Sequence, residues 1–294
     1  MHKEIENMQT KSVLVTGASS GLGAAAASLL AKRGYHVYAA VRRLGTGPAG
    51  TCEIELDVTK PETIEHAQSQ ITRAEDGRPL WALVNNAGIC VPAPLEILNA
   101  DELRRQLEVN LIGQFTVTQA FLPQLRQSRG RIINVTSGLG SIAVPFLGAY
   151  SMAQFAKMAF SDILRRELMH SGVLVSVVQP GAIYTPIWDK FHAAADLATA
   201  KDHRDKVHPY ASRFQAFLEQ NESNARASPT RPDDFAKAIL DTLESKEPAA
   251  HIPVGLDAEQ FIEMARSHSP HSIDQLFASG MPSSTDFASH GGNA

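Results

Sequence analysis

Three glycines near the amino end of the chain have the spacing and the surroundings of a phosphate-binding loop. They stand in the stretch 16–23, which follows an apolar run and leads at once into an alanine-rich stretch. Glycine allows a tight turn and a close approach of backbone to phosphate, and a helix start supplies free N–H groups and a positive dipole end. The context predicts a dinucleotide pyrophosphate site, the alternative being a plain strand-to-helix turn. The predicted site residues are Gly17, Ser19, Ser20, Gly21, Leu22 and Gly23.

An arginine pair, Arg42 and Arg43, follows the second apolar run. In dinucleotide-binding folds an acidic side chain at this point holds the ribose 2′-OH of NAD, whereas an arginine accommodates the 2′-phosphate of NADP. No carboxylate stands here, and a guanidinium offers phosphate oxygens both charge and a fork of donors. The sequence therefore predicts NADP(H) as the cofactor, the alternative being that both arginines face solvent.

Apolar runs and helical patterns alternate along the chain, and these elements must position the loops. Continuous apolar runs predict strands at residues 12–15, 36–41, 52–56, 81–84, 131–135, 173–178 and 250–254. Helical spacing predicts helices at residues 21–33, 61–74, 101–125 and 149–170. Apolar strands separated by helices are typical of a parallel sheet covered on both faces. We expect a single doubly wound, Rossmann-type α/β domain of about seven strands over residues 11–281.

Residues 186–229 interrupt this alternation with a polar and aromatic stretch. They stand where a substrate-covering lid is needed, and their aromatic side chains either contact substrate or form the lid's own core. The aromatic residues in this stretch are Trp188, Phe191, Tyr210, Phe214 and Phe217. Tyr184 and Trp188 lie nearest the cofactor loop and are the predicted substrate contacts.

Further motifs follow in order on the predicted strands and helices. They are Asp57-Val58, Asn85-Asn86-Ala87-Gly88, Asn110, Ser137 thirteen positions before Tyr150, and Pro180-Gly181-Ala182-Ile183-Tyr184-Thr185. With the glycine loop they resemble the short-chain dehydrogenase/reductase family over roughly residues 11–255. Residues 81–89 and 160–168 are most similar to its retinol and hydroxysteroid dehydrogenase branch, whose members act on bulky apolar alcohols and ketones.

The resemblance implies a role for each motif. Ser137 is expected to hydrogen-bond the substrate oxygen, Tyr150 to exchange its proton while hydride moves at carbon, and Asn110 to support a water-linked proton path. Cofactor contacts are implied for Asp57 and Val58 at the adenine, Ile183 and Thr185 at the nicotinamide, and Asn86, Ala87, Gly88, Pro180 and Gly181 along it.

The chain departs from the family one helical turn after the tyrosine. The family carries a lysine there that binds the nicotinamide ribose and lowers the pKa of the tyrosine, whereas this chain has Gln154. Gln154 shares a helix face with Tyr150 and can bond a ribose hydroxyl, but it carries no charge to stabilise a tyrosinate. Lys157 lies close to Tyr150 in azimuth but about 10 Å along the axis. We expect it to pack or point elsewhere.

Three accounts of Gln154 stay open. A ketone reductase can manage without the ammonium, because reduction uses a protonated tyrosine. The scaffold can also serve a non-redox lyase or isomerase, or a non-catalytic NADP(H)-binding protein. We predict the first: an NADP(H)-dependent enzyme interconverting a ketone and a secondary alcohol on an apolar substrate.

Composition bounds the partners and the compartment. A net charge of −4 with no long basic block argues against nucleic-acid binding, and no apolar run is long enough to span a membrane. Two cysteines without metal-ligand spacing favour a reducing compartment, so we expect a cytoplasmic protein. Ser269 and Pro270 favour a loop at His268 and His271, and no metal site is predicted.

Residues 1–10 are predicted to be a flexible tail, and residues 282–294 a disordered tail. The resemblance implies a homodimer or homotetramer formed through helices 101–125 and 149–170.

Overall fold

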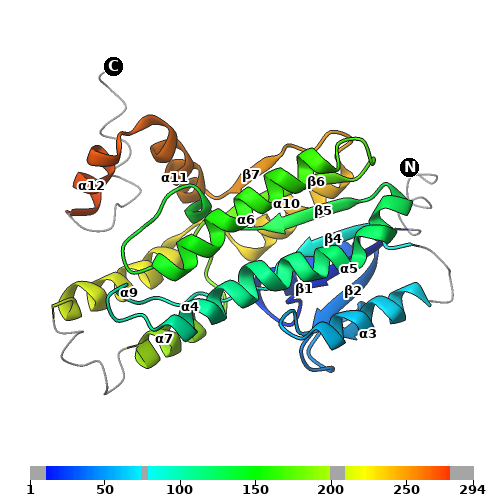
Figure 1. The fold of residues 1–294 in the computed structure, drawn as a ribbon, viewed down its shortest axis with the longest axis horizontal. Coiled ribbons are helices and arrows are strands. Elements are labelled where there is room, and N and C mark those ends of the chain that lie inside the picture. The colour runs from blue at the N-terminus through cyan, green and yellow to red at the C-terminus, as the bar shows by residue number, and fades with distance from the viewer. Residues whose placement is uncertain (1–10, 74–78, 199–208, 279–294) are drawn as a thin grey trace.

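The computed structural model describes residues 11–73, 79–198 and 209–278. Within them, seven parallel strands form one sheet in the order β3-β2-β1-β4-β5-β6-β7 (Figure 1). The strands are β1 (Ser12–Thr16), β2 (His36–Val41), β3 (Cys52–Glu55), β4 (Ala82–Asn85), β5 (Arg131–Val135), β6 (Leu174–Pro180) and β7 (His251–Val254). The predicted doubly wound α/β fold is confirmed, and both predicted tails lie outside the described residues.

Helices cover both faces of the sheet (Figure 1). On one face lie α2 (Gly21–Lys32) and α10 (Pro232–Glu244), and on the other lie α3 (Pro61–Thr72), α5 (Gly113–Ser128) and α6 (Gly148–Glu167). In β1, Val13 and Val15 are buried toward α2 and α10, whereas Leu14 is buried toward α3 and α5. Because both faces are covered, the central strands β1 and β4 are buried along their whole length, whereas the edge strand β3 is partly exposed.

The strand order reverses beside β1, and this reversal positions the site. The chain runs outward from β1 through β2 to β3, then returns to β4 on the other side of β1 and continues to β7. In open α/β sheets the loops at such a switch point diverge, and ligands bind in the crevice beyond the carboxyl ends of the strands. The loops that follow β1 and β4 border this crevice.

Residues 100–128 are helical without a break, as predicted for residues 101–125, but a π turn that was not predicted lies within this stretch. The structure has α4 (Ala100–Leu107), a π-helical turn η1 (Glu108–Ile112) and then α5. A π turn accommodates an extra residue without glycine or proline, so apolar spacing does not reveal it, and such turns are frequent at functional sites. The turn contains Asn110, one of the predicted site residues.

The predicted lid region is helical, with α7 (Ile187–Ala198) and α9 (Ala211–Ala227). Two more helices follow β7: α11 (Leu256–Ser267) and α12 (Pro270–Ala278). The loop predicted at His271 is wrong, because a proline is well tolerated in the first turn of a helix and Pro270 begins α12. Within the described ranges there is no cluster of potential metal ligands, and no helix has the length and apolarity needed to cross a membrane.

Candidate active site and cofactor cleft

A cavity of about 650 Å³ lies beyond the carboxyl ends of β1, β4, β5 and β6, under α7. It brings together nearly all of the predicted site residues. The predicted residues that line it are Gly17, Ser19, Ser20, Gly21, Leu22, Gly23, Arg42, Asp57, Val58, Asn86, Ala87, Gly88, Asn110, Ser137, Tyr150, Gln154, Pro180, Gly181, Ile183, Thr185 and Trp188. Arg43 and Tyr184 do not line it.

The loop after β1 has a shape that only glycine allows. Gly17 and Gly21 have φ angles of +68° and +57°, in the left-handed region that disfavours a side chain. A Cβ atom on Gly23 would lie 2.4 Å from both the Gly17 carbonyl oxygen and Asn86 Nδ2. The backbone can therefore approach a ligand closely, and the start of α2 adds the dipole and N–H groups that suit a pyrophosphate.

Asn86 and Thr16 fasten this loop to the end of β4. The Asn86 side chain donates to the Thr16 carbonyl oxygen at 2.9 Å. The backbone N–H groups of Asn86 and Ala87 both donate to Thr16 Oγ1, at 2.9 and 3.0 Å. The backbone segments that follow β1 and β4 are thus held together at one end of the crevice by the protein's own hydrogen bonds.

At the edge of the cavity near β2 and β3, Arg42 and Asp57 have different surroundings. Arg42 is exposed and lines the cavity, so its guanidinium is available to a phosphate. The Asp57 carboxylate is occupied, because its Oδ1 accepts from Thr59 N at 3.0 Å and from Thr59 Oγ1 at 2.8 Å. This turn fixes Asp57 and Val58 as part of the wall.

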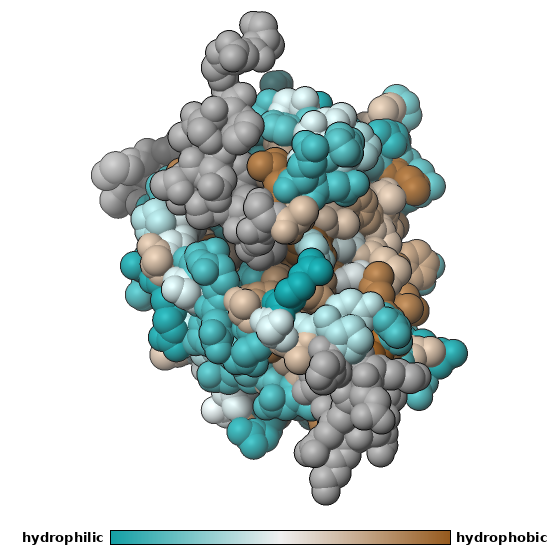
Figure 2. Space-filling view, turned by 90° about the vertical axis from the view of Figure 1, so that its left-hand side faces the viewer, coloured by the Kyte–Doolittle hydropathy of each residue, from teal (hydrophilic) through white to brown (hydrophobic). Residues whose placement is uncertain are grey.

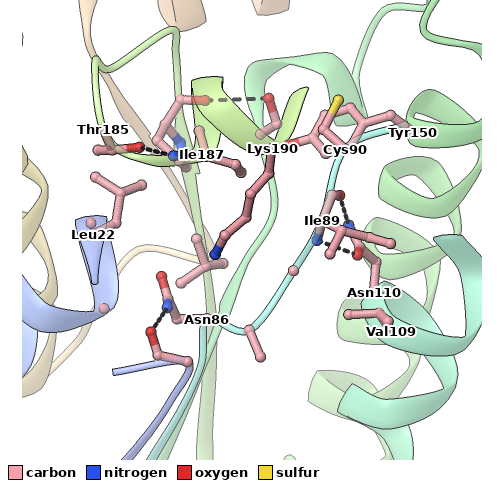
Figure 3. Close-up of a pocket in the computed structure, with 18 of the residues that line it drawn as sticks. Leu22, Asn86, Ile89, Cys90, Val109, Asn110, Tyr150, Thr185, Ile187 and Lys190 are labelled. Carbon is pink, nitrogen blue, oxygen red and sulfur yellow. Dashed lines mark hydrogen bonds between the residues drawn. The ribbon is translucent and has the colours of Figure 1, made fainter. Parts of the chain in front are cut away.

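Asn110 holds the loop after β4 rather than standing free. Its Oδ1 accepts from the Ile89 N–H at 2.9 Å and its Nδ2 donates to the Ile89 carbonyl at 3.0 Å (Figure 3). Gln106 adds a second clamp, accepting from Val91 N and donating to the Ile89 carbonyl, both at 2.8 Å. Both amides are buried, so the π turn and α4 fix this wall of the cavity.

Tyr150 and Ser137 face the same end of the cavity. Ser137 Oγ donates to the Pro180 carbonyl at 3.3 Å and accepts from Leu139 N at 3.2 Å, which aims the hydroxyl at the end of β6. Burial raises the pKa of the Tyr150 phenol well above its ordinary range, and the Cys90 thiol raises it further. Side-chain hydrogen bonding from Gln154 and Ser137 lowers that pKa by less. The phenol is therefore protonated at neutral pH and is suited to donate a proton.

Gln154 offers an acceptor that the protein leaves unused. Its side chain is 2% exposed, and its Oε1 has no hydrogen-bond partner. A buried unpaired carbonyl oxygen is costly, and a hydroxyl donor from a ligand removes that cost. Together with the glycine cradle, this oxygen fits a nicotinamide dinucleotide, in which ribose hydroxyls accompany a pyrophosphate.

The segment after β6 is held from α11. A Cβ atom on Gly181 would lie 1.9 Å from Asp257 Oδ1, and Asp257 Oδ2 accepts from Ala182 N at 2.6 Å. This contact sets the path of the chain toward Ile183 and Thr185, both of which are buried. No local sequence signal marks Asp257 as a site residue, because nothing beside it in the chain indicates a contact with Ala182 so many positions away.

The lid forms a small aromatic core of its own. Trp188, Phe191, Phe214 and Phe217 are all buried and pack with one another. Trp188 and Phe191 also line the cavity, so the lid contributes both structure and wall.

Tyr184 lies outside the cavity, and the guanidinium carbon of Arg226 stands 4.0 Å from the centre of its ring. Lys190 extends from α7 toward Leu22 and Asn86 (Figure 3).

The comparisons with known proteins agree with this geometry. The sequence matches the family described as short chain dehydrogenase over residues 11–196. The chain belongs to this short-chain dehydrogenase family. The predicted family resemblance is confirmed, and 17-beta-hydroxysteroid and retinol dehydrogenases are among its relatives.

Three relatives show how far the similarity extends. A 3-amino-tetrahydro-pyrrolizinone reductase of Xenorhabdus hominickii is 50% identical over 285 residues, 95% of this chain and 99% of the relative. The 17-beta-hydroxysteroid dehydrogenase type 6 of Homo sapiens is 43% identical over 189 residues, 62% of this chain and 59% of the relative. A solved short chain dehydrogenase of Burkholderia cenocepacia in complex with NADP is 27% identical, with a TM-score of 0.70, over 92% of this chain and 99% of that one.

Proposed function

We propose that this short-chain dehydrogenase is an NADP(H)-dependent oxidoreductase that interconverts a ketone and a secondary alcohol on a largely apolar substrate. The observation that carries the proposal is the partly buried Tyr150 phenol beside Ser137, in the same cavity as the glycine cradle. When bound, the dinucleotide supplies or accepts the hydride. Arg42 on the cavity wall favours the phosphorylated cofactor, since no acidic side chain replaces it at the end of β2.

The protein's own groups manage the proton and the substrate oxygen. A carbonyl carbon that gains a hydride leaves negative charge on its oxygen, which must be protonated. In this proposal Ser137 Oγ holds that oxygen and Tyr150 gives it a proton, and both side chains line the cavity. Because its pKa is raised, the phenol holds its proton at neutral pH, which favours the direction of reduction.

The first substrate to test is a bicyclic ring ketone that carries nitrogen. The pyrrolizinone reductase is similar to this chain over nearly the full length of both proteins, so the likeness includes the lid as well as the cofactor half. The apolar wall formed by Trp188 and Phe191 suits the hydrocarbon part of such a ring system. Steroid and retinoid carbonyl compounds follow as the second group of the substrate panel.

Tyr150→Phe tests the mechanism. We expect NADPH-dependent turnover to fall by about a hundredfold or more, because general acid assistance is worth roughly 10²–10⁴ in rate. NADPH binding, followed by fluorescence, stays within about twofold, since the ring is kept. Tyr35→Phe is the matched control, because Tyr35 is a buried tyrosine that precedes β2 and does not line the cavity. Near-full activity of Tyr150→Phe contradicts the mechanism.

The same assay separates the two rival functions. NADPH binding without turnover of any panel member indicates a non-catalytic binder. Conversion of substrate without a change in nicotinamide absorbance indicates a lyase or isomerase.

We also propose a homodimer or homotetramer in the cytoplasm. Apolar side chains are exposed on the layer of helices that faces the viewer in Figure 1. In Figure 2 this layer lies on the right-hand side, where brown surface is visible. The exposed apolar side chains are Ile112, Phe115, Met152, Phe155 and Ile163. Light scattering of Phe155→Glu tests the assembly, which we expect to dissociate. Cys52 and Cys90 are both free, as suits a reducing compartment.

A further inference from the structure

Lys157 is a lysine buried within the protein. It lies on α6, is 2% exposed, and lines the same cavity as Tyr150 and Gln154. Its Nζ donates to the Val135 carbonyl at the end of β5, and in the described part of the chain no acidic side chain pairs with it. A buried amine without a counter-charge costs stability. This cost indicates that Lys157 binds a ligand or takes part in the reaction.

The geometry of α6 brings Lys157 toward Gln154. The two residues are three positions apart and thus share a helix face, and a lysine side chain in a helix leans toward the amino end. An ammonium has three donors, of which the Val135 carbonyl takes one. Gln154 Oε1 is a buried acceptor without a partner. The spare donors of Lys157 and the spare acceptor of Gln154, which line one cavity, match a pair of ligand hydroxyls, each of which both donates and accepts.

We infer that Lys157, together with Gln154, binds the ribose hydroxyls of the dinucleotide and supplies the positive charge that assists Tyr150. The cation thus comes from one helical turn farther along α6 than in the family pattern. This inference rests on the proposed function and identifies Lys157 as the residue that supplies the positive charge for it. The expectation that Lys157 packs or points elsewhere stays the alternative.

The proton balance explains what the charge does. Tyr150 gives its proton to the substrate oxygen, which leaves a phenolate in a buried site. The Lys157 ammonium, which lines the same cavity, stabilises the phenolate, can return a proton to it, and is itself reprotonated from solvent. Burial lowers the pKa of Lys157 to about 7, so the amine exchanges protons near neutral pH. The other titratable residues lining this cavity are Cys90, Asp57, Asp257, Arg42, Arg105 and Lys190.

Lys157→Met removes the charge and keeps the length of the side chain. We expect kcat for reduction to fall at least about tenfold and NADPH to bind about fivefold more weakly. The melting temperature stays the same or rises, because an unpaired buried amine is lost. Wild-type kcat falls as pH rises above about 7, whereas the variant loses this limb of the profile. Lys237→Met, on the exposed face of α10, is the matched control.

A double variant moves the charge by one turn. Lys157→Met combined with Gln154→Lys is expected to recover most of the lost kcat. Retention of wild-type kcat and pH profile by Lys157→Met overturns the inference. So does a folded, NADPH-binding double variant that recovers nothing, because the loss then reflects packing alone.

A binding measurement tests Lys157 even if no substrate is turned over. The dissociation constant of NADPH is measured by fluorescence across neutral pH. In the wild type we expect weaker binding as pH rises above about 7, and in Lys157→Met a flat profile. Flat profiles in both overturn the inference. Absence of turnover by the wild type, with the pH-dependent binding intact, overturns the proposed reaction alone.

Discussion

The cofactor side of the cavity is held by backbone and amide hydrogen bonds, whereas the lid side is held by aromatic packing. Asn86, Thr16 and Asn110 lock loops whose shape requires glycine. Opposite them, α7 meets α9 through aromatic rings, with the ring centroids of Phe191 on α7 and Phe217 on α9 lying 6.5 Å apart. Hydrogen-bonded loops accept few substitutions, while apolar packing tolerates exchange of side chains of similar volume. The lid is therefore the part that can adapt to different substrates over one fixed cofactor site.

Among the variants proposed here, Gly23→Val is expected to have the largest effect, and it acts on the cofactor side of the cavity. The added carbon would lie 2.4 Å from the Gly17 carbonyl oxygen and from Asn86 Nδ2, so the loop must shift away from its place. Overpacking of this kind costs about 1–3 kcal/mol, and we expect NADPH affinity to fall by about a hundredfold. Fluorescence titration measures it. Ser28→Val introduces the same side chain at a half-buried position of the same helix, and an equal loss there contradicts the argument.

Phe217→Ala tests the lid side. Phe217 is 4% exposed and packs against Phe146, with ring centroids 5.3 Å apart. Truncation of a buried phenylalanine costs about 3–5 kcal/mol, and if the lid loosens locally, that loss appears as substrate KM raised by about tenfold with NADPH affinity unchanged.

The matched variant for the lid lies in the main core. Phe121→Ala removes a fully buried ring packed under the sheet, in the layer of α3 and α5. We expect it to lower the free energy of unfolding, measured by denaturant titration, without a selective rise in KM. If both variants raise KM equally, the lid is not a separate unit.

Arg42→Ala sharpens the comparison within the cofactor side. Loss of a charged hydrogen bond to a phosphate costs about 1.5–3 kcal/mol when the pair is well formed, and less when it is exposed. We expect NADPH to bind about tenfold more weakly and NADH to be unaffected. Arg43→Ala is predicted to have the smaller effect, because Arg43 does not line the cavity. Equal losses for NADPH and NADH contradict a 2′-phosphate contact at Arg42.

The cofactor side was largely predictable from the sequence, because its chemistry lies in contiguous motifs. The stretch 16–23 signals its turn locally, and each of its predicted residues lines the cavity. Lys157 and Asp257 were not identified as site residues, since the first depends on which way a helix face turns and the second on a contact across 75 residues with Ala182. The π turn at Asn110 leaves no mark in apolar spacing. Site residues that belong to a contiguous motif can be predicted from the sequence, whereas residues that act through contacts between distant segments can be identified only from the fold.

The smallest expected effect concerns the polar latch between the lid helices. Glu222 on α9 accepts from Arg226 at 2.6 Å and lies 2.7 Å from His192 Nε2 on α7. Hydrogen bonds from Arg226 and then from His192 lower the pKa of Glu222. Because the pKa of Glu222 is lower in the folded protein than its unfolded value of about 4.5, the ionised carboxylate stabilises the contact between α7 and α9 at pH values above 4.5. This stabilisation is lost as the pH falls through the pKa of Glu222 in the folded protein.

Glu222→Gln is therefore expected to raise KM about twofold at neutral pH and to abolish the further rise that the wild type shows in acid. Steady-state kinetics from neutral pH down to about pH 3, well below the unfolded pKa, measure both values. Glu219→Gln changes a carboxylate on the same helix that bonds only within α9, to Gln215 at 2.7 Å, so its KM follows the wild type. Because exposed ion pairs contribute little, the effect stays well below that of Phe217→Ala. If Glu222→Gln instead matches or exceeds Phe217→Ala, polar contacts rather than aromatic packing hold the lid, and the contrast between the two sides of the cavity fails.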